Sequence, residues 1–384
     1  MKKKIIFAVF IIVLTTLLSV TAYCEESSVE DAVGSQLENL SLDEFEKFIE
    51  GLDDGLMGGT IEEFLQSLIE GKLPEGEEIF SSLFIQVGKE LANCLILCSS
   101  IIIICILCST LQSFKGKFLQ NGVGNVVNFV CLAAILVCVL AAIIGLIDLV
   151  IETISMLKKL MDIVFPLLVT MLTFLGAGKS AMIFSPLMAA LSGVVLSLIQ
   201  SVIVPIFLTC MIFSVIGNIS ESIKFEKLRM FFKNFSEWLL SLGFGLFFII
   251  SSAKTFFGGN IDTVSIKAAK FALSSYVPIL GGYLSDGFDI VLAGAVLVKN
   301  AIGFTSLLAL LLIIFVPVLK LIMFLLAFKL TAGITESFTD SRISGMLSSF
   351  SSNFGILIAA LLGVGFLFFT LVMMAVYCGN MGVL

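Results

Sequence analysis

Two stretches, IVPIF (residues 203–207) and FVPVL (residues 315–319), each place a proline in the middle of a long apolar run. Proline removes a backbone donor and clashes with the preceding turn, so inside a helix it costs about 3 kcal/mol or more. Two more prolines lie in similar runs, and the four form pairs that are each 112 residues apart. The pairs are Pro166 with Pro278 and Pro205 with Pro317. This spacing predicts a repeated arrangement of Pro-kinked helices.

Other sequence around the prolines repeats in the same order. Lys158 and Lys270 are also 112 residues apart, ISES (219–222) is similar to ITES (334–337), and GFGLFF (243–248) is similar to GVGFLFF (363–369). We therefore predict a tandem internal repeat, with one membrane unit at residues 151–257 and a second at 263–377 within the final region 258–384. The alternative is a chance placement of helix breakers in apolar sequence of low complexity.

Composition indicates the class of protein. Hydrophobic residues make up 59% of the 384-residue chain and charged residues 13%, against about 25% charged in soluble proteins. We expect an all-α, polytopic membrane protein. Four apolar runs have the length of single spans, and two are overlong, so that each is either one kinked helix or a hairpin of two. The single spans are Leu91–Leu111, Val126–Ile147, Trp238–Phe257 and Phe354–Tyr377; the overlong tracts are Ile183–Gly217 and Ile290–Ala332.

The N-terminal part differs in charge from the rest. Residues 1–22 have a basic start, an apolar stretch and small residues at Val20 and Ala22, as in a signal peptide; an uncleaved first membrane helix is the alternative. Residues 23–80 carry 2 Lys against 17 Asp and Glu. Within the region 23–85, SLDE (41–44) and TIEE (60–63) have capping-box spacing and precede amphipathic runs. We expect small extracytoplasmic helices that pack on a partner or on the membrane surface, or else a solvated acidic linker. Residues 86–150 then hold the first two spans.

Lysine and arginine near the ends of spans predict the orientation. Six crossings place both chain ends outside if the short segments around Pro166 and Pro278 are re-entrant or interfacial and each overlong tract crosses once. Asn121, Lys227 and Arg342 would then be cytoplasmic, and Ser28, Asn260 and Leu384 extracytoplasmic. Seven to nine crossings result if a tract is a hairpin.

Sites of chemistry are scarce in the sequence. The chain has no histidine, which removes the commonest general base and metal ligand. Charges inside apolar tracts are costly, so they are candidates for a polar pathway, of which Asp148 and Lys299 are the main ones. Glu152, Lys179 and Lys320 belong to the same group, and snorkelling lysines are the alternative explanation. Nine cysteines without nearby histidine favour small packing residues over a metal site. We predict no catalytic, cofactor-binding or metal-binding residues.

Several segments resemble a known family. They are the signal peptide, the stretch LDEFEKFIEGL, the two spans that follow, and KAAKFALSSYVPILGGYLSDGFDIVLAG (Lys267–Gly294). Together they are similar to stage III sporulation protein AE of endospore-forming Firmicutes. The resemblance implies a multi-pass protein of the outer forespore membrane on the mother-cell side, with residues 23–85 in the intermembrane space. It also implies partners: other stage III A proteins, the stage II sporulation protein Q complex, a membrane insertase and the lipid bilayer, but no nucleic acid.

The resulting expectation is a non-enzymatic component of the stage III A complex, which links mother cell and forespore in the manner of a secretion channel and supports late forespore gene expression. The resemblance supplies no catalytic residue and no cofactor. The main alternative is a self-contained secondary transporter or permease that uses the interface between the two repeat units. Such a transporter would move a solute when reconstituted alone, whereas a component of a complex would need its partners. A membrane-embedded enzyme is a third alternative.

Overall fold

Helices account for nearly all of the described structure. A computed structural model describes residues 42–52, 65, 68, 76–113, 121–178, 181–182, 186, 191–219, 225–249, 281–337 and 341–380. Within these ranges the chain forms helices and short turns, and no strand occurs. The predicted all-α class is confirmed.

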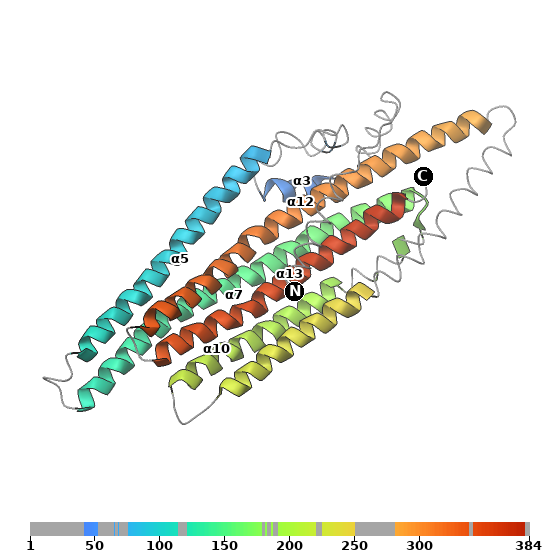
Figure 1. The fold of residues 1–384 in the computed structure, drawn as a ribbon. Helices are drawn as coiled ribbons and strands as arrows, with labels where there is room; N and C mark the ends of the chain where they lie inside the picture. Colours follow the sequence, from blue (N-terminus) through green and yellow to red (C-terminus); the bar gives the residue numbers. More distant parts are fainter. Residues whose placement is uncertain are drawn as a thin grey trace.

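The helices form an elongated bundle (Figure 1). In chain order they are α3 (Asp43–Glu50), α5 (Gly76–Ser113), α7 (Asn121–Phe174), a segment made of η1 (Leu191–Val195), α9 (Leu196–Leu198), η2 (Ile199–Ile203) and α10 (Val204–Ile219), a helix at 226–249, α12 (Gly281–Glu336) and α13 (Ser341–Asn380). We call the end of the bundle where α5, α10 and α12 finish the turn end; it lies at the left of Figure 1. The helix 226–249, α7 and α13 begin there and run back in the opposite direction. Residues 121, 226 and 342 thus share one end of the bundle, as the predicted topology requires.

Five helices are long and apolar enough to cross a membrane. The candidate spans are Val87–Leu107, Leu132–Phe174, Gly193–Asn218, Asp289–Glu336 and Arg342–Tyr377. They overlap five of the predicted apolar runs, so the chain is a multi-pass membrane protein. The sixth predicted run, Trp238–Phe257, is helical as far as residue 249, and its remainder lies outside the described residues.

The structure corrects the expectation of a short re-entrant segment at Pro166. Helix α7 runs through Pro166 without interruption for 54 residues, about 80 Å at 1.5 Å per residue. Pro166 is exposed, and so is Asp162, whose carbonyl loses its helical partner because proline has no N–H. At this surface position neither the ring nor the freed carbonyl has to fit into a packed interior, so the helix continues. The counterpart Pro278 lies outside the described residues.

A glycine ends α7. Gly176 has a φ of 76°, which is the left-handed region that glycine occupies without steric cost. Ala177 N–H donates to Leu172 O at 2.8 Å, and Gly176 N–H donates to Thr173 O at 3.0 Å. This pair of bonds is the Schellman motif, which satisfies carbonyls at the end of a helix.

The two overlong tracts contain single helices. Residues 290–332 lie wholly within α12, and Pro317 is buried inside that helix. The first tract is helical from Leu191 onward, and Pro205 is the second residue of α10, directly after the π-helical turn η2. Wide π turns beside a proline absorb the missing hydrogen bond. The described parts of both tracts therefore form one helix each and no hairpin.

Each Pro-containing tract is followed by a second helix that folds back along the bundle. The helix 226–249 follows α10, and α13 follows α12 (Figure 1). A Pro-containing tract followed by a second helix is therefore present twice, whereas the short Pro-containing segment predicted before each tract is absent at Pro166 and lies outside the described residues at Pro278. The predicted start of the first unit at residue 151 falls inside α7, so the exact division into units stays a prediction.

Helix α13 packs against both α12 and α10, and its interior contacts are tight. The rings of Phe207 and Phe354 lie 6.0 Å apart between centroids, and those of Phe354 and Phe328 lie 5.7 Å apart. All three side chains are fully buried. A Cβ atom at Gly363 would overlap the ring of Phe244, so this glycine brings α13 close to the helix 226–249.

Helix α3 packs against α7. Phe45 and Ile49 are buried, and Phe48 and Leu52 pack partly against the same core. These four residues form the amphipathic face that the sequence predicts. The acidic N-terminal region therefore supplies at least one helix that docks on the bundle.

Candidate functional site

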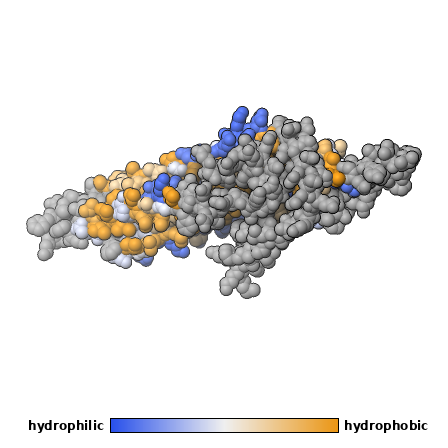
Figure 2. All heavy atoms as spheres, turned by 90° about the horizontal axis from the view of Figure 1, so that it is seen from above, coloured by the Kyte–Doolittle hydropathy of each residue, from blue (hydrophilic) through white to orange (hydrophobic). Residues whose placement is uncertain are grey.

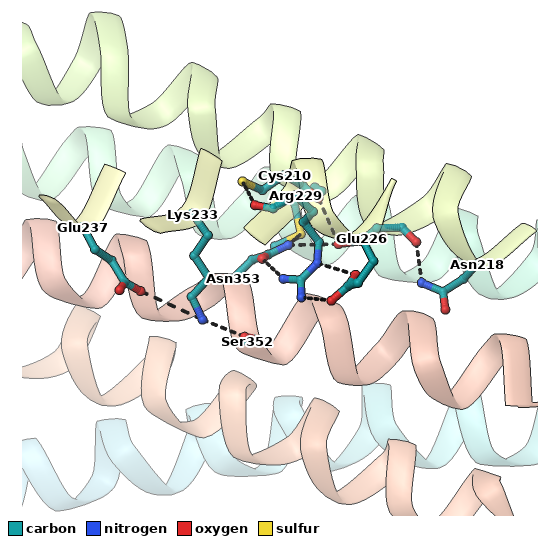
Figure 3. Close-up of polar contacts among 10 residues, drawn as sticks. Cys210, Asn218, Glu226, Arg229, Lys233, Glu237, Ser352 and Asn353 are labelled. Atoms are coloured by element: carbon teal, nitrogen blue, oxygen red, sulfur yellow. Dashed lines mark hydrogen bonds and ion pairs between the residues drawn. The ribbon is translucent and has the colours of Figure 1, made fainter. Parts of the chain in front are cut away.

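A polar network joins three helices inside the bundle (Figure 3). Arg229 comes from the helix 226–249, Asn353 from α13 and Ser214 from α10, and all three are buried. Arg229 Nη1 donates to Asn353 Oδ1 at 2.7 Å, and Asn353 Nδ2 donates to Ser214 Oγ at 3.0 Å. Ser214 Oγ donates in turn to Cys210 O at 2.9 Å. A chain of hydrogen bonds thus runs from a charged group to the backbone of α10.

Glu226 supplies the charge opposite to Arg229. Arg229 Nε donates to Glu226 Oε2 at 2.9 Å, and Nη2 donates to Glu226 Oε1. This two-point arrangement suits the planar guanidinium and the carboxylate. The hydrogen bonds from Glu226 raise the pKa of Arg229 above its usual value, which burial opposes. Arg229 therefore keeps its charge at any physiological pH, and the Glu226 side chain, 51% exposed, remains in contact with solvent.

Further polar contacts surround this centre. Lys233 Nζ donates to Ser352 Oγ at 2.7 Å and lies 3.9 Å from Glu237 Oε1 (Figure 3). Asn218 Nδ2 donates to Ser214 O at 2.7 Å. A Cβ at Gly345 would come within 2.7 Å of Asn218 Oδ1, so a residue larger than glycine at this position would clash with the Asn218 amide. The network is therefore tied to α13 at two successive residues, 352 and 353.

The network fixes the positions of helices rather than presenting a reactive group. Its charged centre is an arginine bound by a carboxylate and an amide, and none of these is a nucleophile paired with a base. A buried polar network whose members are satisfied makes one helix arrangement specific. In the part of the chain that the structure describes, no group of three His, Cys, Asp or Glu could hold a metal ion.

The two predicted pathway residues have different surroundings. Lys299 is fully buried in α12, and its Nζ donates to Val376 O at 2.6 Å, near the C-terminal end of α13. A positive charge is favourable at that end of a helix. Asp148 is exposed on the surface of α7, as is Glu152. One candidate thus lies in the packed interior and the other on the outer surface, and the pathway stays a prediction.

Lys320 forms an ion pair that the sequence did not indicate. Its Nζ lies 2.8 Å from Glu90 Oε1, which joins α12 to α5. The two side chains are 26% and 22% exposed, and both residues lie inside candidate spans. Charged residues in a span are expected to pair with each other, and this pair does so. The side chain of Lys179 lies outside the described residues.

The cysteines that the structure places contribute to packing. Cys94, Cys98 and Cys105 follow the face of α5 that is buried, and Cys210 is buried in α10. All four are free thiols. This matches the predicted role of small packing residues.

Sequence reasoning did not find Arg229, Asn353 or Glu226. Arg229 lies between Lys227 and Lys233, so the local sequence indicates only a basic stretch, and Asn353 lies in the serine-rich run SSFSSNF (348–354). The signal that could have found Asn353 is an amide beside long apolar sequence, since such a group needs a buried partner. Its partner, 124 positions away, could not be read from any local pattern.

Comparison with known proteins decides the family. The model of the family described as stage III sporulation protein AE matches residues 60–379. The chain belongs to this family. The matched range includes the Arg229 network, the Glu90–Lys320 pair and every candidate span. Family membership gives the protein a role in sporulation.

A relative from Bacillus subtilis (strain 168), named stage III sporulation protein AE, is 26% identical over 244 residues. The alignment covers 64% of this chain and 60% of the relative, so the chain matches less than two thirds of that protein. No solved structure matches the chain. The family is thus shown by sequence, and its detailed role in sporulation is taken up below as a proposal.

Proposed function

We propose that the protein is a non-enzymatic, polytopic membrane component of the stage III A sporulation complex, which links mother cell and forespore and supports late forespore gene expression. The family match over residues 60–379 carries this proposal. Its partners would be other stage III A proteins, the stage II sporulation protein Q complex, a membrane insertase during assembly, and the lipid bilayer. Its location would be the outer forespore membrane on the mother-cell side.

Helix α10 and the helix 226–249 form one antiparallel pair, and α12 and α13 form a second (Figure 1). The packing between these two pairs supports a component of a complex over a self-contained transporter. A transporter with its path between repeat units needs polar groups and a cavity near the middle of the membrane. At this interface the ring of Phe354 stacks on Phe328 and contacts Phe207 at a tilt, and all three side chains are fully buried. The polar groups nearby, Arg229 and Asn353, are bonded to each other and to fixed neighbours. These contacts favour a rigid scaffold whose task depends on partners.

Purification from sporulating cells tests the proposal. A tagged chain, isolated after mild cross-linking, should bring down other stage III A proteins, and the same tagged chain expressed in vegetative cells should not. As a second measurement, deletion should permit engulfment, leave late forespore transcription off and leave vegetative growth normal. Isolation of the chain alone from sporulating cells, together with solute movement in vesicles that contain only this protein, would establish the transporter instead.

A further inference from the structure

The exposed face of α7 changes in character near residue 147. Before this point its exposed residues include large apolar side chains; after it they are mainly charged or polar. The exposed apolar residues are Phe129, Val130, Val137, Leu140 and Ile144. From residue 148 to 162 the exposed residues are Asp148, Glu152, Ser155, Lys158, Lys159 and Asp162, with Ile151 and Met156 exposed to 37% and 39% among them; nearer the end of the helix Pro166, Thr170, Thr173 and Phe174 are exposed. Five of them, at 148, 152, 155, 159 and 162, recur every three or four positions and so lie on one face of the helix, which we call the charged stripe.

The opposite face of α7 does not change at this point. Val150, Ile154, Leu157 and Leu160 are fully buried, as is Ile143 before them. Just after α7, Leu175 is buried with Leu292 and Ala295 near the start of α12. The helix therefore stays packed in the bundle along its whole length, and only its outer environment differs between the two parts.

Most exposed large apolar residues of the other helices lie in the part of the bundle next to the turn end, while Val291 on α12 and Tyr377 on α13 are exposed farther from it. On α5 those next to the turn end extend from Ile85 to Leu107, about 33 Å, and on α12 from Leu311 to Leu330, about 29 Å, at 1.5 Å per residue. These heights match the ~30 Å hydrocarbon core of a bilayer. Figure 2 shows hydrophobic side chains gathered over the same part of the molecule, at its left. We call this surface the apolar belt.

Two kinds of polar side chain within the apolar belt are compatible with lipid, and those of the charged stripe are not. The exposed lysines Lys89 and Lys329 lie near the edges of the belt, where a long side chain can carry its ammonium to the interface. On α5, Ser99 Oγ and Ser100 Oγ both donate to Ile96 O, at 2.8 and 2.9 Å, so their hydroxyls are satisfied inside their own helix. A carboxylate or ammonium cannot be satisfied in this way, and facing hydrocarbon costs it several kcal/mol. A stripe with Asp148, Glu152, Lys159 and Asp162 exposed therefore belongs in water.

We propose that lipid surrounds only the apolar belt, and that residues 148–174 of α7, with the part of α12 packed beside them, project into water on the extracytoplasmic side, opposite the turn end. Asn121 to Ile147 accounts for about 40 Å of α7, and the rest of the helix extends about 40 Å further. Helix α3 docks on α7, and its first turn holds Asp43, Glu44 and Glu46. Three carboxylates in one turn are stable in water and not in lipid, which agrees with an aqueous environment for the helix. This inference does not depend on the role in sporulation.

Cysteine labelling on intact cells tests it with matched positions on one helix. The variants Ile144→Cys, Ser155→Cys and Lys159→Cys each place a thiol on the exposed face of α7, and Leu157→Cys places one on the buried face. A membrane-impermeant maleimide is added from outside, and the increase in label over the parent chain is measured. Because the thiolate is the reacting form, positions 155 and 159 should react at least about tenfold faster than 144. Position 157 should stay unlabelled, which shows that the fold is intact.

Three results would overturn the proposal. Equal, slow reaction at 144, 155 and 159 would mean that lipid or protein covers the charged stripe. Equal, fast reaction at 144 and 155 would mean that the apolar belt does not mark the bilayer. Reaction at 155 and 159 only after the cells are permeabilised would place the projecting half in the cytoplasm. If Leu157→Cys labels, this substitution has disturbed the buried face, and Leu160→Cys, buried on the same face, then replaces it as the control.

Discussion

Arg229 carries a full charge inside the bundle and depends on a small number of acceptors. Glu226 accepts two of its hydrogen bonds and Asn353 a third. Since Glu226 lies on the same helix, the bond to Asn353 is the one that connects Arg229 to α13. At the scale of single residues, this bond has the greatest consequence for the fold.

We therefore predict that Asn353→Leu, which keeps the volume but removes the amide, lowers stability by roughly 1–3 kcal/mol because a buried charged donor loses its acceptor. The melting temperature in detergent, followed by the fluorescence of Trp238, the single tryptophan, measures this. Ser352→Ala is the control, since that hydroxyl accepts only from the partly exposed Lys233. Equal melting temperatures for the two variants would show that the hydrogen bond between Arg229 and Asn353 does not stabilise the fold.

The Glu90–Lys320 pair gives a second prediction at this scale. Removing one partner leaves the other charge uncompensated, so Glu90→Gln and Lys320→Met should each destabilise the protein. Because both side chains are partly exposed, we expect roughly 1–2 kcal/mol each, below the cost for fully buried pairs. The double variant should lose less than the sum of the two. Strictly additive losses in the melting temperature would show that the two groups do not interact.

At the scale of elements, the contact between α13 and the helix 226–249 depends on Gly363. A methyl group there would overlap the ring of Phe244, whereas one at Gly355 meets open space. Alanine favours helix over glycine by about 1 kcal/mol, so Gly355→Ala should be neutral or slightly stabilising and Gly363→Ala destabilising. Thermal melting of the purified variants measures both.

A double variant tests whether overlap with the Phe244 ring is what makes Gly363→Ala less stable than Gly355→Ala. If it is, adding Phe244→Ala to Gly363→Ala should recover part of the stability, because the methyl group would occupy space that the ring leaves. If Gly363→Ala melts like Gly355→Ala, the two helices can separate without cost, and the close approach is not needed.

The prolines of α10 and α12 give a further prediction at the scale of elements. Pro205 and Pro317 hold equivalent places in the predicted repeat, although Pro205 is exposed beside a π turn and Pro317 is buried. If the kinks matter to function, Pro205→Ala and Pro317→Ala should reduce spore yield to similar degrees while the protein still accumulates. Spore counts and immunoblots measure this. Normal spore yield in the double variant would make the prolines tolerated packing features.

At the scale of the whole molecule, the alternating helices predict the sides of the membrane. Single cysteines at Asn121, Lys227 and Arg342 should react with an impermeant reagent only after the cells are permeabilised, because all three belong to the turn end, where the loops next to Asn121 and Lys227 are basic. Arg342 is accompanied by Glu336 and Asp340, so its side is predicted from the repeat. Cysteines at Ser28, Asn260 and Leu384 should react in intact cells. Reaction of Lys227→Cys in intact cells would mean that a further segment crosses before it.

The position of Leu384 separates two kinds of repeat. An outside Leu384 with an inside Lys227 gives both units the same orientation. A cytoplasmic Leu384 would give them opposite orientations, which is a common basis for alternating access, and would favour the transporter.

The class of fold and the order of its elements follow from the sequence alone. Apolar length, which is a local signal, predicted membrane helices and placed the ends of the two overlong tracts at Gly217 and Ala332, close to the ends of α10 at Ile219 and α12 at Glu336. The same local reasoning failed at Pro166, because whether a proline interrupts a helix depends on what surrounds it. In this bundle Pro166 lies on the surface, and the helix continues.

Tertiary structure decided which residues meet and which face outward. Arg229 and Asn353 are 124 positions apart and share no pattern, so only folding brings the guanidinium to its amide. The candidate span Leu132–Phe174 contains an 18-residue window with a mean hydropathy of 3.0, and the 43-residue span as a whole still includes the charged stripe. Hydropathy averages both faces of a helix, and the buried face of α7 stays apolar throughout. The surrounding medium acts only on the exposed face, so the proposed edge of the bilayer can be located only after the packing is known.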